Sequence, residues 1–279
     1  MTFNLSKDIT VKMKKLGLTI GILTLSTASF ADTYQFELSG GLSKVNIDYG
    51  FGETELDDTI LTGQFLFSPV ETGAKPLAEA TYLAKANNIK LIHLMLDNDS
   101  DTTYDIAQAE FYVPQTNLYI APFYIYSSSE YDGEKESDNN YGFNIGFTPM
   151  EGMRLSTFWI DDIDYELNID FKYVKQLDNN NAFNLQLAFA KAEDDEFYDQ
   201  DDYVGLEFDY FFNPTTSIGI EYHSTVSAKK VLTEGFLILG EDSIGIRAEK
   251  FFNDTWSMQA NYYTSDDIDS WRLGISFRF

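Results

Sequence analysis

The chain has 279 residues, a formal net charge of −26 and no cysteine, which excludes disulfides and thiolate metal sites. Nucleic acid is excluded as a partner, because binding to its phosphates requires a basic surface and this chain is strongly acidic. The mean hydropathy is −0.25, and after the first 31 residues no apolar run approaches the roughly 20 residues that a membrane-spanning helix needs.

The first 31 residues differ from everything that follows. Lysines at positions 7, 12, 14 and 15 precede an apolar run over Leu16–Leu25, and Ser29 and Ala31 frame Phe30 before Asp32. A basic start, a short apolar stretch and small residues at a cleavage site predict a secretory signal peptide over residues 1–31. Its four lysines and one aspartate carry +3, so removing it from −26 leaves residues 32–279 at about −29.

From residue 32 onwards, the dominant pattern is alternation of apolar and polar residues. Phe183, Leu185 and Leu187, for example, alternate with Asn184 and Gln186, which is the period of a strand with two different environments. The expected strands are 34–49, 58–68, 77–96, 103–113, 117–126, 140–148, 152–160, 164–176, 182–192, 202–212, 215–230, 236–251, 255–264 and 270–279. Fourteen is an even number, as single-chain outer-membrane barrels require. The predicted fold class is all-β: an up-and-down antiparallel transmembrane β-barrel of about 14 strands.

Two stretches leave the strand number open. Residues 77–96 could split at Asn87–Asn88 into two strands, but we expect one long strand with a bulge there. Residues 215–251 are long for a hairpin, and we expect them to turn near 232–235 and to project beyond the membrane. Twelve or sixteen strands remain alternatives.

The connections between the expected strands fall into two alternating sets. The short, nearly neutral set carries the Pro, Asn and Gly that tight turns need: 69–76, 114–116, 149–152, 178–181, 213–215 and 253–255. The acidic set is 50–58, 97–102, 127–139, 161–164, 193–202, 225–241 and 265–269, with 27 acidic residues against three lysines. This arrangement places a net charge of −24 on one end of the barrel, with the tight turns at the other end.

Many charged residues share the polar face of the strands. The residues predicted to line a pore are Glu166, Asp170, Lys172, Glu207, Asp209, Glu221, Arg247, Glu249, Arg272 and Arg278. Glu37, Lys44, Asp48, Glu79, Lys85, Glu110 and Arg154 are also expected to face inward. Because so many charges could not sit in a dry core without a heavy desolvation cost, the interior is expected to be wet. These residues could form salt bridges in the wall, line an ion path, or do both.

Residues that would indicate catalysis or metal binding are few. The only histidines are His93 and His223, and no nucleophile motif accompanies them, so both are interpreted as ordinary wall residues. The acidic run 193–202 lacks the glycine and the spacing of a calcium loop and is interpreted as a solvated loop. No catalytic, cofactor-binding or metal-ligating residue and no cofactor is predicted.

The last ten residues carry a family resemblance. Trp271, Leu273, Ile275, Phe277 and Phe279 form an apolar face, and the alternate positions carry small residues and two arginines. A bilayer covers such a face directly. A closing amphipathic strand that ends in phenylalanine resembles the last strand of bacterial outer-membrane porins. In that family this strand is read by the barrel-assembly machinery, which gives Phe279 the role of an assembly signal.

The resemblance implies an outer-membrane location, with outer-membrane lipid and lipopolysaccharide as surroundings and the assembly machinery as a partner. It also implies a passive diffusion channel for small hydrophilic solutes and ions rather than an enzyme, and the acidic rim favours cations. No connection is long enough to resemble the infolded loop of trimeric porins, so a monomer is expected. A barrel enzyme of the lipase or protease type and a non-conducting structural or adhesive barrel are the alternatives.

Overall fold

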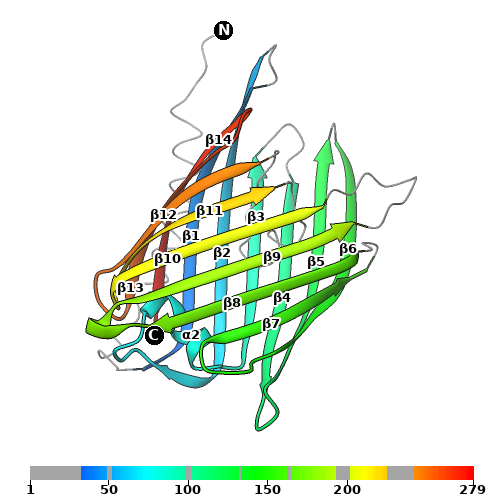
Figure 1. The fold of residues 1–279 in the computed structure, drawn as a ribbon. Helices are drawn as coiled ribbons and strands as arrows, with labels where there is room; N and C mark the ends of the chain where they lie inside the picture. The colour runs from blue at the N-terminus through cyan, green and yellow to red at the C-terminus, as the bar shows by residue number, and fades with distance from the viewer. Residues whose placement is uncertain are drawn as a thin grey trace.

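The computed structural model describes residues 33–48, 52–97, 102–131, 133–161, 165–192, 202–224 and 242–279, and the predicted signal peptide lies outside these ranges. Fourteen antiparallel strands form a closed barrel in which each strand pairs with its sequence neighbours and β1 pairs with β14 (Figure 1). The strands are β1 (Thr33–Asp48), β2 (Glu53–Glu71), β3 (Asn88–Asp97), β4 (Thr102–Val113), β5 (Leu118–Tyr131), β6 (Glu134–Phe147), β7 (Met153–Ile160), β8 (Tyr165–Gln176), β9 (Ala182–Ala192), β10 (Tyr203–Asn213), β11 (Thr216–Ser224), β12 (Ser243–Phe251), β13 (Trp256–Thr264) and β14 (Ile268–Arg278). The predicted fold class and strand number are confirmed.

Burial alternates along the strands as the sequence pattern predicts. In β11, Ser217, Glu221 and His223 are buried, whereas Ile218 and Ile220 are 50% and 53% exposed. The exposed apolar side chains continue around the ring, for example at Leu42, Leu91, Leu155, Leu167, Ile246 and Leu273. An apolar band that large on the outside of a closed barrel is stable only against lipid. Within the described ranges, no helix is long and apolar enough to cross a membrane.

The ring closes where β14 meets β1. The inner face of this seam carries small residues, with Gly41 opposite Gly274 in the register. At its end, the Phe279 amide donates to the Phe36 carbonyl oxygen (3.0 Å), and the Phe36 amide donates to the Phe279 oxygen (2.8 Å). The two rings also stack, with their centroids 5.6 Å apart. The last residue therefore joins β14 to β1 on the lipid side.

The expected long strand 77–96 is wrong in its first half. A 3-10 turn, η1 (Leu77–Glu79), leads into one helical turn, α2 (Ala80–Leu83), and β3 begins only at Asn88. The apolar residues there do not face lipid, because Ala80 and Ala86 pack inside the barrel against Tyr34, Leu66 and Val70. The strand number is unaffected, since β3 still provides one crossing.

The expected loop 127–139 is also wrong. β5 and β6 continue their ladder through it to the pairs Glu130–Lys135 and Tyr131–Glu134. Ladder hydrogen bonds satisfy the backbone of these polar residues even where no core lies beneath them. Beyond β11, residues 225–241 lie outside the described part of the chain, as does most of the acidic run 193–202.

Replacing Phe279 by alanine should lower the yield of folded barrel, because the variant loses the ring stack on Phe36 at the closing seam. The measurement is the fraction of the heat-modifiable folded band in outer-membrane extracts on an unheated gel. Phe279→Tyr keeps an aromatic ring and should retain most of the yield. Equal folded yields for the wild type and Phe279→Ala would contradict the assembly role.

Candidate functional site

The predicted pore-lining residues fall on the inner face of the barrel wall wherever their side chains are described. Those with described side chains are Asp170, Lys172, Glu207, Asp209, Glu221, Arg247, Glu249, Arg272 and Arg278, and they alternate with exposed apolar neighbours. Glu166 lies in β8, but its side chain falls outside the described part of the structure. Which of these residues contact a permeating solute stays a prediction.

Of the other charges expected to face inward, two lie on the outer face, and two lie inside the barrel as expected but not on a strand. Lys44 and Asp48 share the face of lipid-facing Leu42, because they are an even number of residues away from it. Glu79 and Lys85 lie inside the barrel but on the connection between β2 and β3 rather than on a strand. Glu37 and Lys44 lie an odd number of residues apart in β1, so they cannot both face inward in one regular strand. The sequence assignment failed there for this reason.

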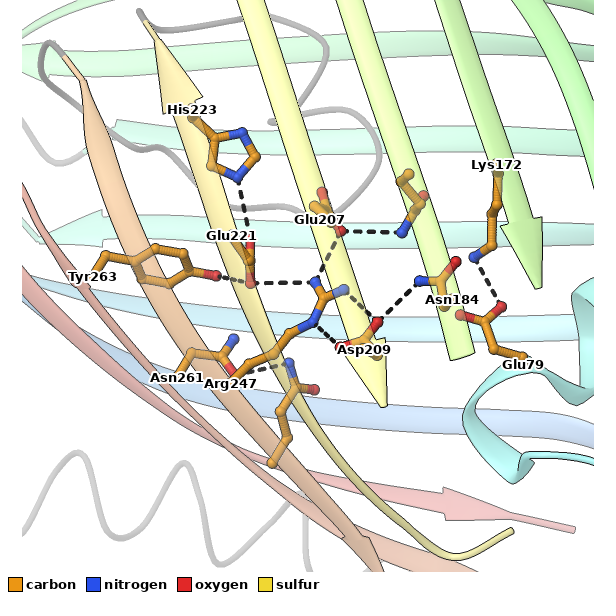
Figure 2. A network of polar contacts seen from close by, with 12 residues as sticks. Glu79, Lys172, Asn184, Glu207, Asp209, Glu221, His223, Arg247, Asn261 and Tyr263 are labelled. Carbon is orange, nitrogen blue, oxygen red and sulfur yellow. Dashed lines mark hydrogen bonds and ion pairs between the residues drawn. The ribbon is translucent and has the colours of Figure 1, made fainter. Parts of the chain in front are cut away.

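Arg247 on β12 is the centre of a charged network on the inner wall (Figure 2). Its Nε and Nη2 donate to both oxygens of Asp209 at 2.6 Å, and its Nη1 donates to Glu207 (2.9 Å) and Glu221 (3.2 Å). Glu207 and Glu221 are direct cross-strand neighbours in β10 and β11. Two like charges in that position repel each other, so the guanidinium between them is what allows both to be accommodated.

A glycine makes this network possible. Arg247 is paired with Gly219, and Gly219 is paired with Asp209, so the guanidinium must reach across the middle strand to form its two parallel bonds. A Cβ at position 219 would overlap the Asp209 carboxylate and lie 3.0 Å from the Arg247 Cγ. The inner face of β11 is therefore bare at the point where the Arg247 side chain crosses it.

Glu221 also connects the network to a buried histidine. Its Oε1 accepts a hydrogen bond from the Tyr263 hydroxyl (2.9 Å), and its Oε2 lies 3.2 Å from His223 Nε2. His223 Nδ1 lies 3.0 Å from the Tyr203 hydroxyl, and the two rings stack with centroids 6.2 Å apart. Neither tyrosine was predicted from the sequence. The Tyr203 ring lies over Gly205, and the Tyr263 ring lies over Gly245. Glycines on the polar face, which leave room for a large ring, were the sequence signal that could have identified these tyrosines.

The connection between β2 and β3 folds into the barrel, and we call residues 77–86 the inward connector (Figure 1). On one side, the Arg278 Nη1 donates to the Leu77 oxygen (2.8 Å). On the far side of the ring, Glu79 pairs with Lys172 of β8 at 2.8 Å, and the Lys85 ammonium donates to Thr148 at 2.9 Å. The connector therefore extends across the interior at the end of the barrel that carries the short turns.

Tyr82 of the connector is held by the β7–β8 side of the barrel. Its hydroxyl lies 3.1 Å from the Gly152 oxygen and 3.3 Å from the Lys172 oxygen. Burial raises the pKa of the Tyr82 phenol, although Arg154 opposes the shift, so the hydroxyl stays protonated at neutral pH and donates. The Arg154 guanidinium lies over the rings of Tyr119 (4.3 Å) and Tyr82 (5.4 Å). Such cation–π contacts fix the position of a charge as well as a ring.

Three adjoining cavities occupy the interior around this network. The first, about 260 Å³, is lined by Arg154, Asp170 and Lys172, and it shares Glu207 and Gln186 with the second, about 160 Å³. The second shares Arg247 and Gln259 with the third, about 250 Å³, which also has Arg272 on its wall. The second cavity has four acidic residues against Arg247, whereas the third has only the two arginines. The arrangement provides polar space with acidic and basic walls side by side.

Known proteins of similar structure are barrels. No protein-family model and no curated protein sequence matches the chain. The outer membrane protein Omp33 of Acinetobacter baumannii is 19% identical and has a TM-score of 0.69, with 89% of this chain and 99% of that chain covered. OccK7 (OpdD) of Pseudomonas aeruginosa (9% identity, TM-score 0.45, 88% and 99% covered) and a KdgM porin in complex with disordered oligogalacturonate (10%, 0.40, 87% and 99%) are more distant. The likeness to Omp33 shows that this chain shares its fold, a closed barrel in this chain, with an outer membrane protein.

Replacing Arg247 by methionine should destabilise the barrel strongly, because three partly or fully buried carboxylates lose their shared cation. Breaking a buried ion pair in this way costs about 3–5 kcal/mol, which should appear as a lower melting temperature of the folded band. Lys44→Met is the matched control, since the pair of Lys44 with Glu55 lies on the outside and such pairs contribute about 0–1 kcal/mol. Equal shifts for the two variants would refute the central role of Arg247.

Proposed function

We propose that the protein is an outer-membrane porin that passes small hydrophilic solutes and ions by passive diffusion. The observation that carries the proposal is the set of adjoining polar cavities, which share Glu207, Gln186, Arg247 and Gln259 inside a closed wall whose outside is apolar. Charged side chains at this density need water. Barrels of 16–18 strands leave an aqueous channel, while 8 strands fill with side chains, so 14 strands favour a narrow water-filled path.

The inward connector sets the width of that path. It is held from three directions, by Arg278 of β14, by Lys172 of β8 and by Thr148 beside β6. The Leu77 amide also donates to the oxygen of Pro214 (2.8 Å) in the β10–β11 turn. A constriction held in this way makes a monomeric pore sufficient, since no partner subunit is needed to narrow it. Outer-membrane lipid, lipopolysaccharide and the barrel-assembly machinery are the further partners we propose.

Cation preference is the finer part of the proposal. The connections on the loop side, together with the strand ends that adjoin them, carry a net charge of −24 in the sequence, and charged mouths raise the local concentration of counter-ions. Inside, the acidic lining of the second cavity, which includes Glu79 and Glu249, outnumbers Arg247. Both terms attract cations, the first in a salt-dependent manner because the loops are expected to be solvated.

The geometry favours a channel over the enzyme alternative. His93 lies on the outer face beside Asp105 (2.6 Å), whereas His223 lies on the inner face, so the two do not form a common site. Ser243 is the cross-strand neighbour of His223, but both ring nitrogens of His223 contact Tyr203 and Glu221 instead. A serine nucleophile would need one of those nitrogens as its base.

Replacing residues 73–86 by a short Gly-Ser linker should increase single-channel conductance, because the segment that crosses the interior is removed while the strands remain. Planar-bilayer recording of the variant and the wild type in the same salt measures the difference. The double substitution Lys75→Ala/Glu151→Ala is the matched control, since this exposed pair lies at the same end of the barrel. Unchanged conductance after linker replacement in a folded barrel would contradict the constriction.

The selectivity proposal predicts a reversal potential across a KCl gradient that indicates cation preference at low salt and a weaker preference near 1 M, where the Debye length is about 3 Å. Glu207→Gln/Asp209→Asn should reduce the cation preference at both salts, because it removes two of the three negative charges around Arg247 and leaves Arg247 balanced by Glu221 alone. Neutralising Asp194, Asp195, Asp201 and Asp202 in the acidic loop should act mainly at low salt. Anion preference in the wild type would overturn the proposal.

A further inference from the structure

Three metal-ligating side chains converge on the inner wall beside the Arg247 network. Glu207, Glu221 and His223 each offer one ligand atom, and these atoms lie within 4.8 Å of one another. His223 Nε2 and Glu221 Oε2 are already 3.2 Å apart. Two ligand atoms on a tetrahedral ion with bonds of about 2.0 Å are separated by about 3.3 Å. His223 and Glu221 already have this spacing, so only the Glu207 carboxylate has to move toward them to complete a three-ligand set.

The histidine is oriented as a metal-ligating histidine would be. Its Nδ1 is hydrogen-bonded to the Tyr203 hydroxyl (3.0 Å), and the stacked Tyr203 ring fixes the plane of the imidazole. Without an ion, the Nε2–H of His223 donates to Glu221 Oε2. An ion at Nε2 would take the place of that proton, and the ring would then carry its proton on Nδ1 and donate it to the Tyr203 oxygen. A ligand histidine usually gives its other ring N–H to such an outer partner, and the side chain of His223 is 2% exposed, so its position is well defined.

Contacts with Arg247 leave both carboxylates able to bind an ion as well. Arg247 and Gln186 donate to Oε2 of Glu207, and Arg247 and Tyr263 donate to Oε1 of Glu221. Each ionised carboxylate has about four acceptor positions over its two oxygens, so a carboxylate can contact Arg247 and an ion at once. Glu221 Oε2 is the oxygen that faces His223.

The charge of the cluster favours a dication. Glu207, Asp209 and Glu221 carry −3 when ionised and Arg247 carries +1, which leaves −2 on the inner wall when His223 is neutral. Retaining that net charge in a partly desolvated place is costly, and one divalent ion cancels it. Glu207 and Tyr203 also line the first cavity, so Glu207 is the ligand that an ion in the lumen would meet first, with the buried Glu221 and His223 behind it.

The geometry points to a binding site for a borderline transition-metal dication of the Zn²⁺ type, with Glu207, Glu221 and His223 as ligands. A mixed carboxylate and imidazole set suits Zn²⁺, whereas Ca²⁺ and Mg²⁺ prefer oxygen alone. With three protein ligands the ion keeps an open position for water, as in exchangeable rather than structural zinc sites. Such a site would let the barrel hold a transition metal in its lumen.

The test measures Zn²⁺ binding to the folded wild-type barrel in detergent by titration calorimetry. Excess Mg²⁺ is present to occupy non-specific sites on the acidic loops. We expect one Zn²⁺ per chain, and His223→Gln should weaken binding by roughly tenfold or more. His93→Gln removes the other histidine, on the outer face, and should leave the affinity unchanged. Because the readout is binding, the result does not depend on whether the barrel conducts.

Tyr203→Phe is the second variant, since it keeps the stacked ring and removes only the hydroxyl that orients His223. It should weaken Zn²⁺ binding by roughly tenfold while the heat-modifiable band remains, which separates loss of the site from loss of the fold. The proposal is overturned if the wild type binds no stoichiometric Zn²⁺. It is equally overturned if His93→Gln lowers the affinity as much as His223→Gln, or if Tyr203→Phe leaves the affinity unchanged.

Discussion

The structure depends on the separation of a dry and a wet face by a single layer of sheet. Ile218 and Glu221 are three residues apart on β11, yet one is 50% exposed on the lipid side and the other is 2% exposed inside. Closure of the ring satisfies every strand edge, so the outside needs only apolar side chains. The inside must then accommodate the polar ones, and it does so through charged networks that lie beside smaller buried apolar clusters.

The architecture was predictable because it follows from local patterns in the amino-acid sequence. Alternation over 182–192 and 270–279 gives strands, the Pro and Asn turns give their ends, and the even count gives closure. The inward connector was not predictable in the same way. It packs against Leu66 and Val70 of β2 and Tyr34 of β1, and none of these contacts is local in sequence. Its own apolar residues also fit a strand.

The inner network was predictable in composition but not in its connections. Parity correctly placed Glu207, Asp209, Glu221 and Arg247 on one face, yet it could not assign Arg247 to Asp209 across a glycine. That pairing follows from the register of β10, β11 and β12, in which Gly219 lies between Asp209 and Arg247. One residue of slip in either ladder would move these side chains to the lipid face, so the ladder fixes the site.

In the proposed channel the inward connector sets the width and the wall carries the charge, and Lys172 contacts both. Its ammonium pairs with Glu79 of the inward connector, while its backbone oxygen lies 3.3 Å from the Tyr82 hydroxyl. Asp170, on the same face of β8, lines the first cavity with it. The constriction and the charged wall are thus connected through one strand, opposite the seam where the ring closes.

In the proposed channel the inner face lines a water-filled path. Substituted cysteines can probe both faces of the wall, because the chain has no cysteine of its own. Ser276→Cys places a thiol on the inner face and Ile275→Cys places one on the lipid face of the same strand. A charged methanethiosulfonate reagent should reduce the single-channel current of Ser276→Cys and leave that of Ile275→Cys unchanged. Equal responses of the two variants, or no current through a folded barrel, would contradict the account.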